Sequence, residues 1–413
     1  MKLLHERRSR TVVAIALAML LAPGAASSAD EVIRHRLESG ATVLMSPNSW
    51  NRLVSISVIV DAGSKYDPPS RRGLAHLTAE MLLAGTRDAT GPDLADLIDA
   101  TGAEVGILTR PDFTQIYATV TDVHFEEALS VIGEAVVRPS FDRAALLDVQ
   151  RKAQATVQRE LDDSFTRAYH ELNRLRFGSH PYAYPPTGSH EGIASTSPDD
   201  VRRFYRSRYA GESTVISIVG SFDPDRTVDQ LEGLFADYPE GPVVDVEFPR
   251  VQAPEDDELE LYRAAKIGYV VISYPGPEYG SDDFAAVSVL CAMLGDGTGS
   301  RLYGSLGPSG AGVADIVGSF TSGLFEEGGI VIYAASAKVD LALEIIERLV
   351  DDVREKPASA DEIARAANRL RSAYALRGQR NLIRARWFGR SELAGLGPGY
   401  VEDVQQSSLG RVI

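Results

Sequence analysis

A histidine and a glutamate with the spacing of metal ligands occur in the stretch RRGLAHLTAEMLLAGT, which runs from Arg71 to Thr86. In a helix, residues four apart lie on one face, so His76 and Glu80 would point the same way. An imidazole together with carboxylates can bind zinc or manganese. The alternative is a polar remnant in a cleft, in which His76 is hydrogen-bonded to Glu80 and no metal is held.

The elements that would position these side chains recur along the chain. In the first half, an alternating strand at 53–67 is followed by a helix-like run at 73–83. In the second half, a strand at 266–283 is followed by the apolar run FAAVSVLCAMLG. This repetition predicts two similar halves of about 200 residues each.

The blocks that follow these units match as well. They begin at Asp112 and Glu327, and each predicts a period-two strand, an amphipathic helix, a proline-bearing turn and a second helix. We expect the second helix to begin after an aspartate N-cap, which is Asp142 in the first half and Asp361 in the second.

Strands and helices are mixed without a regular βαβ order, which predicts an α+β fold. We divide the chain into a signal peptide at 1–29, an N-terminal domain at 30–237, a linker at 238–260 that is rich in proline and acidic residues, and a C-terminal domain at 261–413. The first half closes with a capped helix and a strand, SPDDVRRFYRSRYAGESTVISIVGSFD, and the second half has no such pair. We therefore expect the second half to be truncated or diverged, with one sheet edge lacking its neighbour.

The first residues have the layout of a secretory signal peptide, with a basic start, the apolar run TVVAIALAMLLA and a predicted cut after Ala29. Export to the periplasm is the expectation, and an uncleaved anchor is the alternative. No other segment is long and apolar enough to span a membrane. Loss of residues 1–29 removes four basic residues and one acidic residue, which changes the net charge from −16 to −19 and disfavours nucleic-acid binding. The single cysteine, Cys291, lies in an apolar run and is expected to be buried.

The stretch RGLAHLTAEMLLAGT resembles the metal-binding helix of the pitrilysin/insulinase metallopeptidases, which carry the inverted zinc motif H-x-x-E-H. FGSHPYAYPPTGSHEGI, at 177–193, is similar to the G-x-H-P-Y loop of this family, and GDGTGSRLYGSL is similar to a segment of its second domain. The resemblance covers nearly the whole mature chain and implies a clam-like fold of two homologous domains. In this family two histidines and a distant carboxylate hold zinc, and the glutamate of the motif takes a proton from the zinc-bound water.

The motif in this sequence departs from that pattern. His76 matches the first histidine, Ala79 stands at the position of the base, and Glu80 stands at the second histidine. An alanine cannot take a proton, so we assign no catalytic residue and expect no peptidase activity from the chain on its own.

The third ligand of the family is also displaced. Its expected register falls on Thr156 and Val157, and Glu160 lies about one helical turn away. His76, Glu80 and Glu160 are therefore remnant candidates only, and we expect no cofactor on this chain.

A second constellation of the family, an arginine and a tyrosine that grip the substrate carbonyl, is replaced here by Gly307 and Asp315. Arg301 and Tyr303 lie nearby but are expected to have structural roles at a helix start. His180 in the G-x-H-P-Y-like loop is expected to fix that loop rather than bind a metal. The run GDGTGS predicts a loop before a helix, and four further histidines share no spacing with carboxylates: His35, His124, His170 and His190.

Three functions follow from the resemblance. The first is the non-catalytic, substrate-enclosing subunit of a heterodimer, in which a homologous partner carries the zinc and a peptide is the substrate. The second is a zinc peptidase with a rearranged site. The third is a purely structural role, like that of the core subunits of the respiratory cytochrome bc complex, which belong to the same family.

Overall fold

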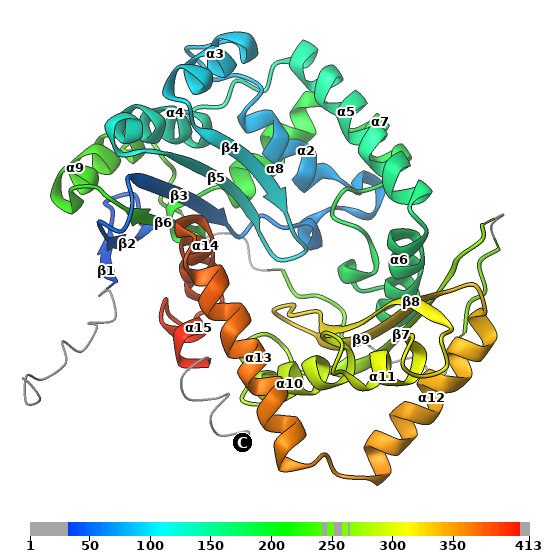
Figure 1. Cartoon of the computed structure of the whole chain (residues 1–413). Coiled ribbons are helices and arrows are strands. Elements are labelled where there is room, and N and C mark those ends of the chain that lie inside the picture. The colour runs from blue at the N-terminus through cyan, green and yellow to red at the C-terminus, as the bar shows by residue number, and fades with distance from the viewer. Residues whose placement is uncertain (1–31, 242–245, 252–257, 263–264, 405–413) are drawn as a thin grey trace, which may run out of the picture.

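The computed structural model describes residues 32–241, 246–251, 258–262 and 265–404. It contains two β-sheets, each with its own helices, and the two sheets lie in the upper and lower parts of Figure 1. The predicted signal peptide at 1–29, and part of the predicted linker at 238–260, fall outside the described residues.

The first sheet has six strands in the order β1-β2-β6-β3-β5-β4. β2 and β6 are parallel, and all other neighbouring strands are antiparallel. The strands are β1 (Ile33–Arg36), β2 (Thr42–Pro47), β3 (Leu53–Val60), β4 (Glu104–Thr109), β5 (Thr114–Thr121) and β6 (Thr214–Gly220).

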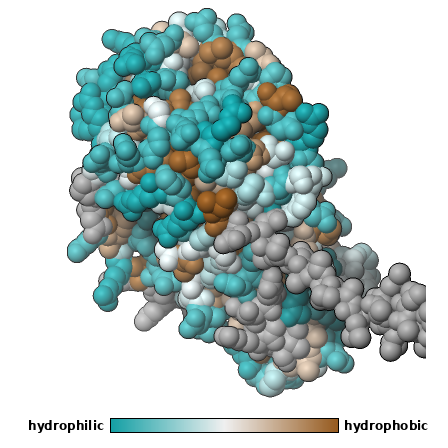
Figure 2. Space-filling view, turned by 90° about the vertical axis from the view of Figure 1, so that its left-hand side faces the viewer, coloured by the Kyte–Doolittle hydropathy of each residue, from teal (hydrophilic) through white to brown (hydrophobic). Residues whose placement is uncertain are grey.

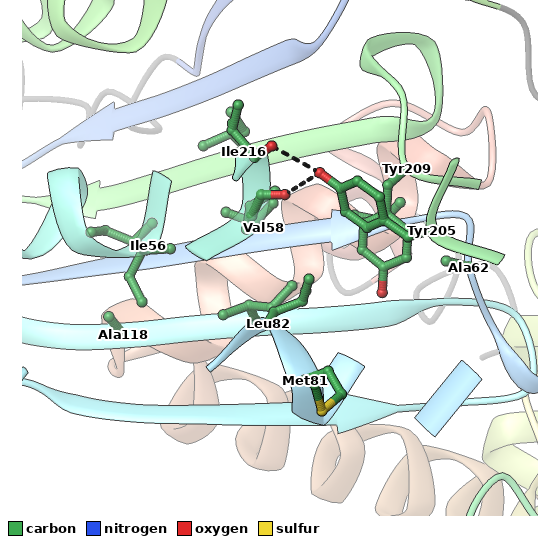
Figure 3. Close-up of a cluster of buried hydrophobic side chains, with 14 of the residues drawn as sticks. Ile56, Val58, Ala62, Met81, Leu82, Ala118, Tyr205, Tyr209 and Ile216 are labelled. Carbon is green, nitrogen blue, oxygen red and sulfur yellow. Dashed lines mark hydrogen bonds between the residues drawn. The ribbon is translucent and has the colours of Figure 1, made fainter. Parts of the chain in front are cut away.

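One face of this sheet carries the main hydrophobic core. Its alternating apolar side chains, such as Ile56 and Val58, pack against helices of the same half (Figure 3). The hydroxyl of Tyr205 donates to the carbonyls of Val136 and Val137 at 2.6 and 3.1 Å, which satisfies a polar group inside the core. The helices of this half are α2 (Leu74–Leu82), α3 (Gly91–Thr101), α4 (Phe125–Val137), α5 (Arg143–Asp162), α6 (Ser164–Phe177), α7 (His190–Ser195), α8 (Pro198–Arg208) and α9 (Pro224–Phe235).

The second sheet has three antiparallel strands in the order β7-β9-β8. They are β7 (Gly268–Gly276), β8 (Ala314–Thr321) and β9 (Gly328–Ser336). The helices of this half are α10 (Phe284–Gly295), α11 (Arg301–Leu306), α12 (Val339–Glu355), α13 (Ala360–Gly378), α14 (Asn381–Leu393) and α15 (Tyr400–Asp403).

The order of elements repeats between the halves. The series β3-α2-α3-β4-β5-α4-α5-α6 corresponds element by element to β7-α10-α11-β8-β9-α12-α13-α14, and β3-β5-β4 pair in the same order as β7-β9-β8. This confirms the predicted α+β fold of two homologous halves with mainly antiparallel sheets. In the first half α8 and β6 follow, and β6 pairs with β3. The described second half has no counterpart of β6, so β7 is an edge strand, as the sequence predicts.

One helix of each half packs on the sheet of the other half. α14 packs on β3 and β6, and α6 packs on β7 (Figure 1). The serines of β3 face α14, and Gly389 allows the close approach, since a Cβ there would lie 3.0 Å from the side chains of Ile59 and Ser217. On the other sheet, the ring of Phe165 lies 4.9 Å from that of Tyr333.

The helix starts mostly follow the sequence. Asp142 caps α5 by accepting the N–H groups of Ala144 and Ala145, as predicted. The prediction of Asp361 as the cap of α13 is wrong, because the helix begins two residues earlier and Ser359 accepts the N–H of Glu362. A serine hydroxyl serves an N-cap as well as a carboxylate does, so both residues were compatible with the pattern.

The face of the molecule in Figure 2 is mainly polar. Figure 2 shows hydrophilic residues over most of one face, with apolar residues scattered among them. Over the described ranges, no helix is both long and apolar enough to cross a membrane. Cys291 is buried, as predicted, and burial raises the pKa of its thiol to about 11.

Candidate functional site

The helix that carries the motif, α2, is held at its start by a residue from the preceding loop. The buried carboxylate of Asp67 accepts the N–H groups of Gly73 and Ala75, both at 2.7 Å. Burial raises the pKa of Asp67 to about 7, although these two hydrogen bonds oppose the shift. Gly73 has a φ of 102°, a left-handed conformation that favours glycine, at a point where a Cβ would lie 3.0 Å from the carbonyl of Thr187.

The three motif positions of α2 lie in different surroundings. Ala79 is completely buried, whereas His76 and Glu80 are partly exposed. Burial lowers the pKa of His76 and therefore favours its neutral form. Burial raises the pKa of Glu80, and the ammonium of Lys152 on α5 opposes that shift.

The hydrogen bond between His76 and Glu80 that belongs to the alternative interpretation of the motif is not formed among the described residues. Neither side chain takes part in a hydrogen bond there, and the only charge that acts on Glu80 comes from Lys152. The helical spacing places both side chains on one face, and the positive charge of Lys152 on α5 acts on the carboxyl of Glu80.

The third-ligand register on α5 carries no carboxylate. The hydroxyl of Thr156 donates to the carbonyl of Lys152 and accepts from the guanidinium of Arg159 at 2.8 Å. Val157 is buried in the hydrophobic core. A cation therefore lies next to the position where the family resemblance places a metal-binding oxygen.

Glu160 lies farther along α5 and has a different partner. Its carboxylate accepts from the hydroxyl of Thr187 at 2.5 Å, and burial raises its pKa. Lys152, whose charge acts on Glu80, precedes Glu160 by eight residues, or about 12 Å of helix. α2 and α5 run in opposite directions, so Glu80 and Glu160 lie at opposite ends of their contact.

These residues do not fit a zinc ion. Among the described residues, no three His, Cys, Asp or Glu side chains are grouped so that they could hold a metal ion. The possibility of a site made of His76, Glu80 and Glu160 is thus not supported by their positions. The assignment of no catalytic residue remains a prediction.

The positions of the second constellation, Gly307 and Asp315, carry no side chain that could donate a hydrogen bond to a substrate carbonyl. Gly307 ends α11, and Asp315 is exposed beside a β-bulge in β8. Arg301 forms a bidentate ion pair with Glu362 on α13, with distances of 2.6 and 2.8 Å. Arg301 therefore joins two helices, as its predicted structural role requires.

His180 fixes its loop, as predicted, and also joins the two halves. Its Nδ1 accepts the N–H of Tyr182 at 3.2 Å, which leaves Nε2 to carry the proton toward the carboxylate of Glu326 at 3.5 Å. Lys65 pairs with the same carboxylate at 2.8 Å and lies 3.6 Å from Asp112. Sequence spacing gave no sign of Glu326, because it lies on the loop between β8 and β9 of the other half.

A small cavity beside α2 contains residues that the sequence did not connect. It has a volume of about 160 Å³ and lies between the start of α2, the end of α5, α6 and the loop that leads into α7. His170 and His190, which share no spacing with carboxylates in the sequence, line it together with Glu160. Four separate segments form this cavity, so no local pattern could have predicted it.

Sequence models of one peptidase family match both halves of the chain. "Insulinase (Peptidase family M16)" matches residues 42–176, and "Peptidase M16 inactive domain" matches residues 195–370. The chain is 24% identical over 350 residues to an uncharacterized zinc protease of Bacillus subtilis, with 83% of each protein covered. It is 27% identical over 372 residues to an uncharacterized zinc protease of Streptomyces coelicolor, with 88% of this chain and 80% of that protein covered. A solved peptidase M16 inactive domain from Pseudomonas fluorescens has a TM-score of 0.85 at 21% identity and covers 92% of this chain and 93% of its own.

Proposed function

Because this chain belongs to the insulinase (M16) peptidase family, we propose that it is the non-catalytic, substrate-enclosing subunit of a heterodimeric zinc peptidase. In this proposal a homologous partner carries the complete motif and the zinc ion. The substrate is a peptide that lies between the two chains.

The observation that carries this proposal is the loss of chemistry inside a retained fold. Ala79 is completely buried at the position of the base, and Arg159 occupies the surroundings of the third ligand. Removal of a general base lowers a rate by roughly 10²- to 10⁴-fold, and the missing ligands add to that loss. A chain with these changes contributes to peptide cleavage through its shape and its contacts rather than through its own reaction.

Export through residues 1–29 is part of the proposal. Its support is the basic start, apolar run and small-residue cut of the sequence. We infer that the mature chain begins at Asp30 and acts in the periplasm.

The test is co-expression of the mature chain with a family homologue that has an intact H-x-x-E-H motif. We expect the pair to co-elute in size-exclusion chromatography and to cleave a fluorogenic peptide, while this chain alone does not. The matched control is a partner whose motif glutamate is changed to glutamine, which should still co-elute and be inactive.

Three outcomes would contradict the proposal. Separate elution of the two chains would exclude the heterodimer. Chelator-sensitive cleavage by this chain alone would favour a rearranged zinc site. A partner that cleaves equally fast without this chain would favour a purely structural role.

A further inference from the structure

The cavity beside α2 contains a buried cation that forms no ion pair with another described residue. Arg72, the residue before Gly73, is only 8% exposed. Its Nη1 donates to the backbone carbonyl of Asp67 at 3.0 Å, and its Nε has no hydrogen-bond partner. The charge of Arg72 acts on the nearby Asp67 and opposes the rise of its pKa, but the two side chains form no ion pair, and the Asp67 carboxyl already accepts two backbone N–H groups. A buried charge is costly unless it is paired, so this site is incomplete as it stands.

An aromatic ring fixes the orientation of this guanidinium. The Cζ of Arg72 lies 3.9 Å from the centre of the Tyr184 ring, a cation–π contact. The Cζ of Arg174 lies 5.9 Å from the same ring. Both arginines line the cavity, so two planar donor groups converge on it from α6 and from the start of α2.

The acidic residues of the cavity leave these donors available. One oxygen of Glu160 accepts from the hydroxyl of Thr187, and among the described residues no hydrogen bond or ion pair joins Glu160 to Arg72 or Arg174. Glu171 lies 3.8 Å from Arg174, which is a loose contact that an incoming carboxylate can replace. His170 also lines the cavity, and burial together with the charge of Arg174 lowers its pKa.

We propose that this cavity binds a carboxylate group of the enclosed peptide, with Arg72 and Arg174 as its donors. A guanidinium can donate two parallel hydrogen bonds to one carboxylate, and the cavity is large enough for the end of a peptide or one short side chain. The inference rests on the proposed function, because it identifies the peptide group that this subunit holds. Two sources supply the same chemistry: the C-terminus of the peptide and an internal acidic side chain.

Calorimetric titration of the mature chain with short N-acetylated alanine peptides separates these sources. The first comparison is between a free C-terminus and a C-terminal amide. The second is between amidated peptides with a central glutamate or a central glutamine. We expect the carboxylate form to bind roughly 10- to 100-fold more tightly in at least one comparison, as for a charge-assisted hydrogen bond.

Three variants connect the preference to the cavity. Arg174→Gln removes a half-exposed donor and should abolish the preference without affecting folding. Arg72→Met keeps the packing on Tyr184 and should do the same. Arg167→Gln, at an exposed arginine of α6 outside the cavity, is the matched control and should keep the preference.

The binding results distinguish failure of the cavity proposal from failure of the proposed function. Equal binding of acid and amide in both comparisons, or an equal loss in Arg167→Gln and Arg174→Gln, would overturn the inference and leave the proposed function standing. N-acetylalanine serves as a small probe. Arginine-dependent binding of this probe without binding of the longer peptides would support the cavity and contradict the proposed enclosure of peptides.

Discussion

At the scale of single residues, the motif has lost its chemistry by replacements that suit the interior. Ala79 fits a completely buried position, where a glutamate without zinc would be an unpaired buried charge. The hydroxyl of Thr156 forms both of its hydrogen bonds within α5, to the carbonyl of Lys152 and from the guanidinium of Arg159. These replacements agree with one another, because each removes a need for the metal.

Restoration of the motif should therefore require α5 as well as α2. We expect the double variant Ala79→Glu with Glu80→His to retain far less than one zinc per chain after dialysis, as the unchanged protein should. Adding Thr156→Glu supplies a third ligand in the expected register and should bring zinc to about one per chain, since zinc sites use three or four protein ligands.

Elemental analysis after dialysis measures this difference. The control adds Gln158→Glu to the double variant, which places the carboxylate on the exposed face of α5. Full zinc retention by the double variant alone would contradict the prediction and would show that Glu160 can serve as the third ligand.

The sequence predicted these positions well and their partners poorly. The i, i+4 spacing was enough to place His76 and Glu80 on one face of α2. The influence of Lys152 on Glu80 depends on how α2 and α5 pack against each other, which local spacing does not contain. The contacts of Glu160 depend on Thr187, a loop residue 27 positions later.

At the scale of elements, α2 depends on a cap that lies several residues before it. Asp67 replaces an adjacent N-cap side chain, because Gly73 at that position has none. The helix start is thereby tied to the loop after β3, and Arg72 lines the cavity beside α2.

The ionisation of Asp67 should make stability depend on pH. Its folded pKa of about 7 lies above the ordinary value of 3.8 for an aspartate, so between these values the folded chain holds a proton that the unfolded chain releases. The contribution of Asp67 to the free energy of unfolding is thus fully present below about pH 4 and is lost as the pH rises through about 7.

Chemical denaturation between pH 4 and 8 measures this effect. We expect Asp67→Asn to flatten the pH dependence in that range. Asp142→Asn is a contrasting control, because hydrogen bonds from Ala145 and Ala144 lower the pKa of that exposed cap and its contribution is lost as the pH falls. An unchanged profile in Asp67→Asn would contradict the assignment.

The elements themselves were largely predictable. Strict alternation identified β3, and the apolar run identified α10. The misplaced cap of α13 is a local ambiguity between Ser359 and Asp361. What the pattern could not show is that the serine face of β3 is buried, because its cover, α14, comes from the other half.

At the scale of the whole molecule, two equivalent hairpins meet between the halves. Phe113 at the end of the β4–β5 loop stacks on Phe325 of the β8–β9 loop, with ring centres 6.1 Å apart. Beside them the carboxylate of Asp112 accepts the N–H of Phe325 at 3.2 Å. Lys65 and His180 complete this contact by reaching Glu326.

Loss of the central cation should weaken the whole chain. Lys65→Met would leave Asp112 buried without its cation, and we expect a loss of about 3 kcal/mol in the free energy of unfolding. Lys356→Met removes an exposed ion pair within α12 and its C-cap and should change it by no more than about 0.5 kcal/mol. Equal effects in urea denaturation would contradict this role of Lys65.

The exchange of helices between the halves also determines when the protein can finish folding. Asn381 at the start of α14 donates to the carbonyl of Leu53 at 2.8 Å across 328 positions of sequence. During synthesis, the sheet of the first half is made long before the helix that covers its serine face. Contacts so distant in sequence form late, because a long loop must close first. Neither half can therefore reach its native state as an independent folding unit, and the chain completes its fold only once α14 has left the ribosome.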